Sequence, residues 1–206
     1  MNVEILIPTC KSEREIISLL QGIELMDSYN EKETPVIYSC LENASAARNR
    51  NYCLDLATAP YLVMIDDDIR GFHPGWAQKL VEPLISDESI LYVSARLLNK
   101  DCTPQHCVGF VKQMHGATVR ARIAPTACIA IRNDGIRFNE EYQGSGWEDI
   151  SFHCRQKAAH PDRYPVINNK VKMVHLNEMK NQKDTYTINK NIFEREFPGE
   201  RARIGL

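Results

Sequence analysis

The sequence lacks both a long hydrophobic run and an excess of one charge. Its 206 residues include 25 Lys and Arg against 27 Asp and Glu, a formal net charge of −2. This balance disfavours a protein that coats nucleic acid or anionic lipid. No apolar run approaches the roughly 20 residues of a membrane helix, and the first residues do not resemble a secretory signal. We therefore expect a cytoplasmic chain without a transmembrane segment.

Cysteine is present but does not follow a disulfide or zinc pattern. The seven cysteines are an odd number scattered through apolar segments, which favours reduced thiols. Cys102, His106 and Cys107, with His115 downstream, are the one hint of a zinc site, but their spacing matches no standard pattern. We interpret these four residues as ordinary loop residues.

Several short motifs for phosphate and metal chemistry are also missing. The sequence contains no G-x-x-x-x-G-K-[ST], no G-x-G-x-x-G and no H-E-x-x-H. P-loop, dinucleotide-binding and zincin functions therefore have no support from sequence. A bound diphosphate would have to be neutralised mainly by a metal ion.

Short apolar runs alternate with helix-like segments from the start of the chain. Hydrophobic residues make up 43% and charged residues 25%, as in ordinary folded domains. The alternation predicts an α/β fold with a mostly parallel central sheet flanked by helices. We find no repeat or linker that would divide the chain, so we expect a single domain. The predicted strands are residues 3–7, 36–40, 61–65, 90–93, 127–131 and 171–174, and the predicted helices begin near residues 13, 45, 75 and 148.

Three consecutive carboxylates follow one of the predicted strands. Asp66, Asp67 and Asp68 come directly after the run 61–65, and open α/β sheets bind ligands beyond the carboxyl ends of their strands. In extended backbone Asp66 and Asp68 share a face while Asp67 turns away. Carboxylate oxygens suit hard divalent cations. A solvated acidic loop is the alternative, and an EF-hand is excluded because its twelfth position would be Ala77.

Two further candidates lie near a predicted helix start and a predicted strand end. After a glycine turn, Trp147 leads into Glu148 and Asp149. The two carboxylates can simply be charges that favour a helix N-terminus. Alternatively, a carboxylate is a general base for an acceptor hydroxyl, and the aromatic ring is a platform for a sugar or nucleobase. His175 follows the run 171–174. A lone histidine is more often a packed residue than a ligand, but this strand-end position makes it a candidate metal ligand.

Together these segments resemble the family 2 type glycosyltransferases of the GT-A fold. The resemblance covers most of the chain and runs, in family order, through the first strand with Pro8 and Thr9, A-A-R-N at 46–49, the strand and acids at 61–68, G-S-G-W-E-D at 144–149, His175, and 191–197. It implies one glycosyltransferase domain over 1–206. Residues 1–70 would form the nucleotide-binding half, which ends in the D-x-D motif, and residues 71–206 the acceptor half.

The resemblance also implies roles for individual residues. Asp66 would contact the ribose and the metal, Asp68 would bind Mn²⁺ or Mg²⁺, and His175 would complete the metal shell. Asp149 would be the general base, and Glu148 its neighbour that positions the acceptor. The remaining nucleotide-sugar-binding residues would be Pro8, Thr9, Arg48, Asp67 and Trp147.

The chain departs from the family pattern after its second predicted strand. The family usually has an acidic segment there that recognises the nucleobase, followed by another helix and strand. Here Cys40-Leu41-Glu42-Asn43 leads almost directly into A-A-R-N. The nucleotide-binding half is therefore contracted, which leaves the identity of the base open, and we do not expect Glu42 to replace the missing acid.

The resemblance implies an inverting, metal-dependent transfer of a sugar from a nucleoside-diphosphate sugar to an acceptor hydroxyl, with a UDP-sugar as the favoured donor. The acceptor would be a glycan, a lipid-linked sugar or, less favoured, a modified nucleobase in DNA. The alternatives are a nucleotidyltransferase-like enzyme and a degenerate GT-A domain that binds a nucleotide sugar without catalysis. We expect the basic residues between 96 and 125 to lie beside the acceptor cleft, or to form a solvated face; they include Arg96, Lys100, Lys112, Arg120 and Arg122.

Overall fold

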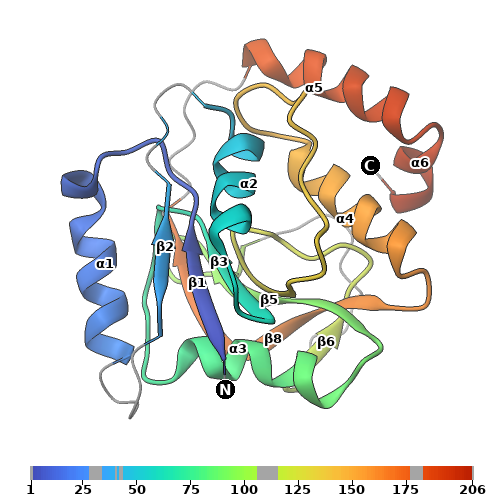
Figure 1. The fold of residues 1–206 in the computed structure, drawn as a ribbon. Coiled ribbons are helices and arrows are strands. Elements are labelled where there is room, and N and C mark those ends of the chain that lie inside the picture. Colours follow the sequence, from blue (N-terminus) through green and yellow to red (C-terminus); the bar gives the residue numbers. More distant parts are fainter. Residues whose placement is uncertain are drawn as a thin grey trace.

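A computed structural model describes residues 2–27, 34–39, 41, 44–105, 116–176 and 183–205. Its centre is an eight-stranded sheet in the order β2-β1-β3-β7-β5-β8-β4, with β6 paired to β8 (Figure 1). The strands are β1 (Val3–Ile7), β2 (Val36–Tyr38), β3 (Tyr61–Ile65), β4 (Ile69–Arg70), β5 (Ile90–Leu98), β6 (Thr118–Arg120), β7 (Cys128–Arg132) and β8 (Tyr164–His175). The helices are α1 (Glu13–Asp27), α2 (Ala46–Leu56), α3 (Trp76–Ser86), α4 (Glu148–Ala159), α5 (Lys183–Glu196) and α6 (Glu200–Ile204).

Most strands of the sheet point the same way. β1 is parallel to β2 and β3, and β5 is parallel to β8. β7 lies antiparallel between β3 and β5, so those two strands share a direction. β4 and β6 run against β8. The predicted mostly parallel α/β sheet is confirmed, and the carboxyl ends of β1, β3 and β8 lie on the same side of it.

Helices cover both faces of the sheet because successive strand residues point to opposite faces. Ile5 and Ile7 of β1 pack with α1 and α3 in one core, whereas Leu6 packs with α2 and Phe152 of α4 in the other. A third, smaller core joins α4, α5 and α6 around Trp147 and Phe193. The two sheet cores hold the strand ends rigidly in place, and the third anchors the glycine turn before α4.

Local sequence signals explain where the first two helices begin. The backbone N–H of Ser12 donates to Glu15 Oε2 at 2.8 Å, which is one of the two hydrogen bonds of a capping box. The Ser12 hydroxyl also donates to this oxygen at 2.8 Å, and the Glu15 N–H donates to the Ser12 carbonyl at 2.9 Å. Ser45 is the N-cap of α2, and its Oγ accepts a hydrogen bond from the backbone N–H of Arg48. α2 therefore begins at a fixed position, and that position determines which of its arginines face inward.

β8 is longer than its apolar run predicted. The run 171–174 covers only the end of the strand, because Asn168, Asn169 and Lys170 interrupt the hydrophobic pattern. These polar residues are tolerated because the amide Nδ2 of Asn168 donates to the carbonyl of Lys79 at 2.9 Å, and that of Asn169 donates to Gly116 at 2.9 Å. No helix in the described part of the chain is long and apolar enough to span a bilayer.

Candidate active site

Asp66, Asp68 and His175 come together at the carboxyl ends of β3 and β8. One possible ligand atom from each lies within 4.8 Å of the others. Backbone pairing holds the two segments side by side, since Ile69 pairs with His175 and the N–H of Leu176 donates to the carbonyl of Asp68 at 3.1 Å. Two carboxylates and an imidazole suit Mn²⁺ or Mg²⁺. The donor set therefore fits a divalent cation.

The electrostatics of these three residues also favour a cation. Burial and the neighbouring charge of Asp68 raise the pKa of Asp66, although the charge of Arg50 opposes them. Burial lowers the pKa of His175, but its hydrogen bond to Asp68 and the charges of Asp68 and Asp66 outweigh this, so the pKa of His175 is raised. The Nε2 of His175 lies 3.3 Å from Asp68 Oδ1, and its Nδ1 lies 3.2 Å from Gln105 Oε1. When Nδ1 carries a proton, it can donate to Gln105 Oε1, and this hydrogen bond orients the ring with Nε2 toward the carboxylates.

Asp67 turns away from the other two aspartates, as predicted, but the cause is a turn and not extended backbone: residues 67 and 68 form a turn in which the N–H of Ile69 donates to the carbonyl of Asp66 at 3.2 Å. Its Oδ1 lies 2.9 Å from Lys11 Nζ, and its Oδ2 accepts a hydrogen bond from the hydroxyl of Thr9. The backbone of buried Thr9 is in turn fixed by Ser39, whose Oγ accepts from the Thr9 N–H at 3.0 Å. Asp67 therefore ties the end of β3 to the loop after β1, which also contains the partly buried Pro8.

Arg50 joins the acidic triplet to the acids of α4. Its Nη2 lies 3.1 Å from Asp66 Oδ1 and its Nη1 lies 2.7 Å from Glu148 Oε1. The guanidinium also lies over the ring of Phe138, 5.2 Å from its centroid. Burial lowers the pKa of Arg50, but the charges of Asp66 and Glu148 more than offset this and raise it, so Arg50 remains charged.

Glu148 and Asp149 begin α4 after a strained turn. Trp147 has a left-handed backbone with φ 72°, and its ring packs against Tyr186 and Phe193 with centroids 5.7 and 5.3 Å away. Left-handed backbone is costly for a bulky residue, and such strain gathers at functional sites. The turn aims Asp149, whose Oδ1 accepts from the N–H of Ile150 at 2.8 Å, toward the same region as Arg50.

Asp149 has the perturbed acidity expected of a base. Burial and the charge of Glu148 raise the pKa of Asp149 to about 6, although Arg50 opposes the shift. A carboxylate of this pKa is mostly ionised at neutral pH and accepts a proton more readily than an ordinary aspartate. Glu148 is nearly fully buried, and its Oε2 has no hydrogen-bond partner among the described residues. In this structure Glu148 therefore contacts the site through Arg50.

Arg48 lies apart from this cluster. Its side chain is 64% exposed, and its Nε lies 3.8 Å from Glu140. The arginine that faces inward is Arg50, which sequence analysis missed together with Lys11 and Gln105. Helical spacing indicates that Arg50 faces inward, because it follows Ala47 by three residues and precedes Leu54 by four, and both of these apolar residues are buried.

Some expectations fall on residues that the structure does not describe. Glu42, His106, Cys107 and His115 lie outside the described residues, so the structure does not test them. Cys102, the one described member of the four residues that gave the hint of a zinc site, is an exposed free thiol. Arg96 is buried, whereas Arg120 and Arg122 lie in another part of the molecule considered below.

Comparison with known proteins supports the resemblance that the motifs indicated. The model of the glycosyl transferase family 2 matches residues 23–117, which include α2, the acidic triplet and α3. No curated protein gives a significant match. The family match therefore covers residues 23–70 of the predicted nucleotide-binding half and residues 71–117 of the predicted acceptor half, and leaves out the first strand.

Several solved structures share the fold at low identity. One of GalNAc-T7 with UDP, GalNAc and Mn²⁺ has a TM-score of 0.63 at 11% identity, over 93% of this chain and 41% of that one. One of S. aureus TarS residues 1–349 has a TM-score of 0.65 at 14% identity, over 99% of this chain and 68% of the other. The structure of glucosyl-3-phosphoglycerate synthase from Mycobacterium tuberculosis, with Mn²⁺, UDP and phosphoglyceric acid, has a TM-score of 0.60 at 12% identity. The match covers 100% of this chain and 79% of that one.

These matches show the fold and leave the activity to be argued from the site. The chain spans less than half the length of GalNAc-T7. The acids at the end of β3, the glycine turn before α4 and the histidine at the end of β8 occur together in one fold and in the predicted order. The chain thus matches glycosyltransferase family 2 over residues 23–117 and has the GT-A fold of its structural neighbours.

Proposed function

We propose that this protein is a metal-dependent, inverting glycosyltransferase that moves a sugar from a UDP-sugar to an acceptor hydroxyl. The observation that carries the proposal is the convergence of Asp66, Asp68 and His175 at one sheet edge, joined through Arg50 to the acids of α4. UDP with Mn²⁺ in the structures of GalNAc-T7 and of the mycobacterial synthase supports the choice of donor and metal.

In this proposal the donor lies between the end of β1 and the acidic triplet. Asp66, Asp68 and His175 would hold Mn²⁺ or Mg²⁺, and the ion would supply a Lewis acid for the departing diphosphate. Pro8, Thr9 and Asp67 line the nucleotide side, and Lys11 holds Asp67 in place. Arg48 and Trp147 complete the proposed nucleotide-sugar set, with Arg48 reaching from the exposed side of α2.

The chemical step needs a base on the side opposite the diphosphate. Asp149 removes the proton from the acceptor hydroxyl as its oxygen forms a bond to the anomeric carbon. The bond from that carbon to the diphosphate oxygen breaks at the same time, so the configuration inverts. Glu148 is a positioning residue: its carboxylate and Asp66 hold Arg50 between them, which fixes the start of α4 relative to β3.

A panel of nucleoside-diphosphate sugars, each with Mn²⁺ and with a chelator, tests the donor half of the proposal. A ligand that binds only the folded protein raises its melting temperature. We expect a metal-dependent shift with UDP-sugars that is lost in Asp68→Ala and kept in Asp149→Asn. Release of UDP together with formation of the glycosylated acceptor then tests catalysis.

The same panel separates the two alternative functions. Donor binding without transfer to any glycan, lipid-linked sugar or DNA acceptor would indicate a non-catalytic module. Release of pyrophosphate with formation of a phosphate ester would indicate a nucleotidyltransferase-like enzyme. No shift with any donor, in folded protein, would contradict the proposed function.

A further inference from the structure

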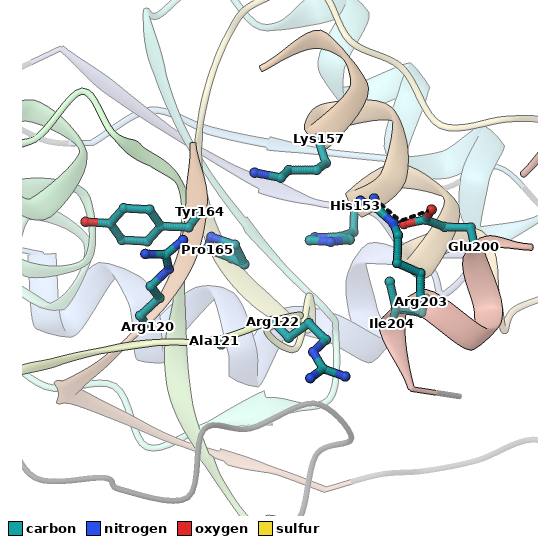
Figure 2. Close-up of a pocket in the computed structure, with 10 residues that line it drawn as sticks. All are labelled: Arg120, Ala121, Arg122, His153, Lys157, Tyr164, Pro165, Glu200, Arg203 and Ile204. Carbon is teal, nitrogen blue, oxygen red and sulfur yellow. Dashed lines mark hydrogen bonds and ion pairs between the residues drawn. The ribbon is translucent and has the colours of Figure 1, made fainter. Parts of the chain in front are cut away.

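A pocket lies away from the acidic cluster. It is a pocket of about 340 Å³ between β6, β8, α4 and α6 (Figure 2). His153 and Lys157 come from α4, Arg120 and Tyr164 from the paired strands, and Glu200 and Arg203 from α6; Ala121, Arg122, Pro165 and Ile204 complete the lining. Its volume is within the range of small-molecule sites.

The lining carries an excess of positive charge. Glu200 is satisfied by Arg203, whose Nη2 and Nε lie 2.6 and 2.7 Å from its carboxylate oxygens. Among the described residues, no ion pair involves Arg120, Arg122 or Lys157. Three cations therefore remain without a carboxylate partner in one small pocket, where their mutual repulsion is relieved by an anion.

Two of these cations are held in place by neutral groups. The guanidinium of Arg120 lies over the ring of Tyr164, 4.1 Å from its centroid. Lys157 donates to the carbonyls of Pro161 and Arg163, which follow the end of α4. Side chains that are already ordered lose less conformational freedom when a ligand binds.

The inner surface of the pocket is apolar and buried. Ala121 and Ile204 are each 4% exposed, and Pro165 is also buried. His153 lies beside them, and its Nδ1 is 3.1 Å from the hydroxyl of Tyr92. Burial keeps the pKa of His153 at about 4, so this histidine is neutral at physiological pH. An apolar floor beneath cations suits an organic molecule that carries an anionic group.

The pocket is distinct from the acidic site, although α4 and β8 contribute to both. Arg120 pairs with Val166, nine residues before His175, or roughly 30 Å along an extended strand. Lys157 follows Asp149 by eight residues, roughly 12 Å along the helix. Arg120 and Arg122, which the sequence placed beside an acceptor cleft or on a solvated face, therefore line a second pocket.

We propose that this pocket binds a small organic molecule carrying a phosphate group. Phosphate oxygens accept charge-assisted hydrogen bonds from guanidinium and ammonium groups, and Arg presents a fork that matches them. The cations from β6, the following loop and α4 surround the space from three directions, while the apolar floor accommodates the organic part. Inorganic phosphate should bind weakly, and a sugar phosphate more tightly.

The proposal goes beyond the glycosyltransferase function and can be tested without donor, metal or acceptor. Backbone amide NMR signals of the ¹⁵N-labelled protein are followed in EDTA during titration with inorganic phosphate and then with glucose 6-phosphate, at constant ionic strength. We expect saturable shifts at Ala121 and His153, and none centred on Asp66. Because no metal is present, failure of the proposed transfer reaction would not affect this result.

Matched variants decide whether the pocket is responsible. Arg122→Gln and Arg122→Gln/Lys157→Gln should weaken glucose 6-phosphate binding by about tenfold or more, since charge-assisted hydrogen bonds are lost. Arg14→Gln/Lys172→Gln removes two exposed cations outside the pocket lining and should leave binding unchanged. Melting temperatures show that each variant is folded. Equal binding by pocket and control variants, or no saturable shift in the original protein, would overturn the proposal.

The phosphate could belong to the acceptor or to a free metabolite, and kinetics separate these sources. In a transfer assay, inhibition by glucose 6-phosphate that is competitive with the acceptor indicates that the acceptor carries the phosphate. A change in kcat at saturating acceptor indicates a separate effector. Either effect must disappear in Arg122→Gln, and an effect that persists there would contradict a role of this pocket in catalysis.

Discussion

α4 and β8 each run between an acidic and a basic region of the molecule. α4 begins with Glu148 and Asp149 beside the acidic triplet and ends near Lys157 in the basic pocket. β8 begins at Tyr164 in the basic pocket and ends at His175 among the carboxylates. A net charge of −2 therefore conceals two regions with opposite ligand preferences. The comparison teaches that charge placement in the fold, and not overall charge, determines what each region can bind.

The largest expected effect concerns the base of the acidic region. Asp149→Asn keeps the shape of the side chain but cannot accept the proton, so the transfer rate should fall by roughly 10² to 10⁴-fold. Donor binding with Mn²⁺ and glucose 6-phosphate binding in the basic pocket should both remain. Initial rates of UDP release measure the first effect. Asp162→Asn, an exposed aspartate after α4, is the control and should retain full activity.

The contrast between Arg50 and Arg48 tests what holds the acidic region together. Arg50→Gln leaves the buried Glu148 and the partly buried Asp66 without their cation, so the free energy of unfolding should fall by about 3 to 5 kcal/mol. Arg48→Gln, on the exposed side of the same helix, should change it by less than about 0.5 kcal/mol. Urea unfolding measures both. Equal effects would show that the Arg50 bridge is not structural.

Metal binding should stabilise only a protein with intact carboxylates. Mn²⁺ at 100 times its Kd adds about 2.7 kcal/mol to the free energy of unfolding. Asp68→Ala should lose this gain because it removes one of the two anionic ligands, whereas His175→Ala should retain a reduced gain because both carboxylates remain. Melting curves with Mn²⁺ and with EDTA provide the measurement. A full Mn²⁺ effect in both variants would place the metal elsewhere.

The acidity of Asp149 predicts opposite pH dependences for activity and stability. The base must be ionised, so the rate should fall about tenfold per pH unit below about 6. The pKa of Asp149 is higher in the folded than in the unfolded chain, so folding takes up a proton between about pH 4 and 6, and this group's contribution to stability decreases as pH rises through that window. Rate and unfolding profiles of Asp149→Asn should both lose this component.

Hydrophobic patterning in the sequence predicted much of the fold. Short strands with a continuous or nearly continuous apolar run, such as Tyr61–Ile65 and Val3–Ile7, were predicted with their observed bounds, because burial on both faces leaves little choice of residue. The sequence also predicted that Asp66 and Asp68 converge, but from extended backbone, whereas in the structure a turn at residues 67 and 68 brings them together. Both conclusions depend on local geometry that a few neighbouring residues determine.

Only the tertiary structure decided which distant residues meet. Arg50 contacts Glu148 across 98 positions of sequence, and Arg120 and Lys157 line one pocket although they lie in separate elements. No local pattern encodes such pairs, because strand order and helix packing determine them. The same physics explains why Arg48 had to be distinguished from Arg50 in the structure: the two lie only two residues apart, about 200° around the helix, so one faces solvent and the other the core.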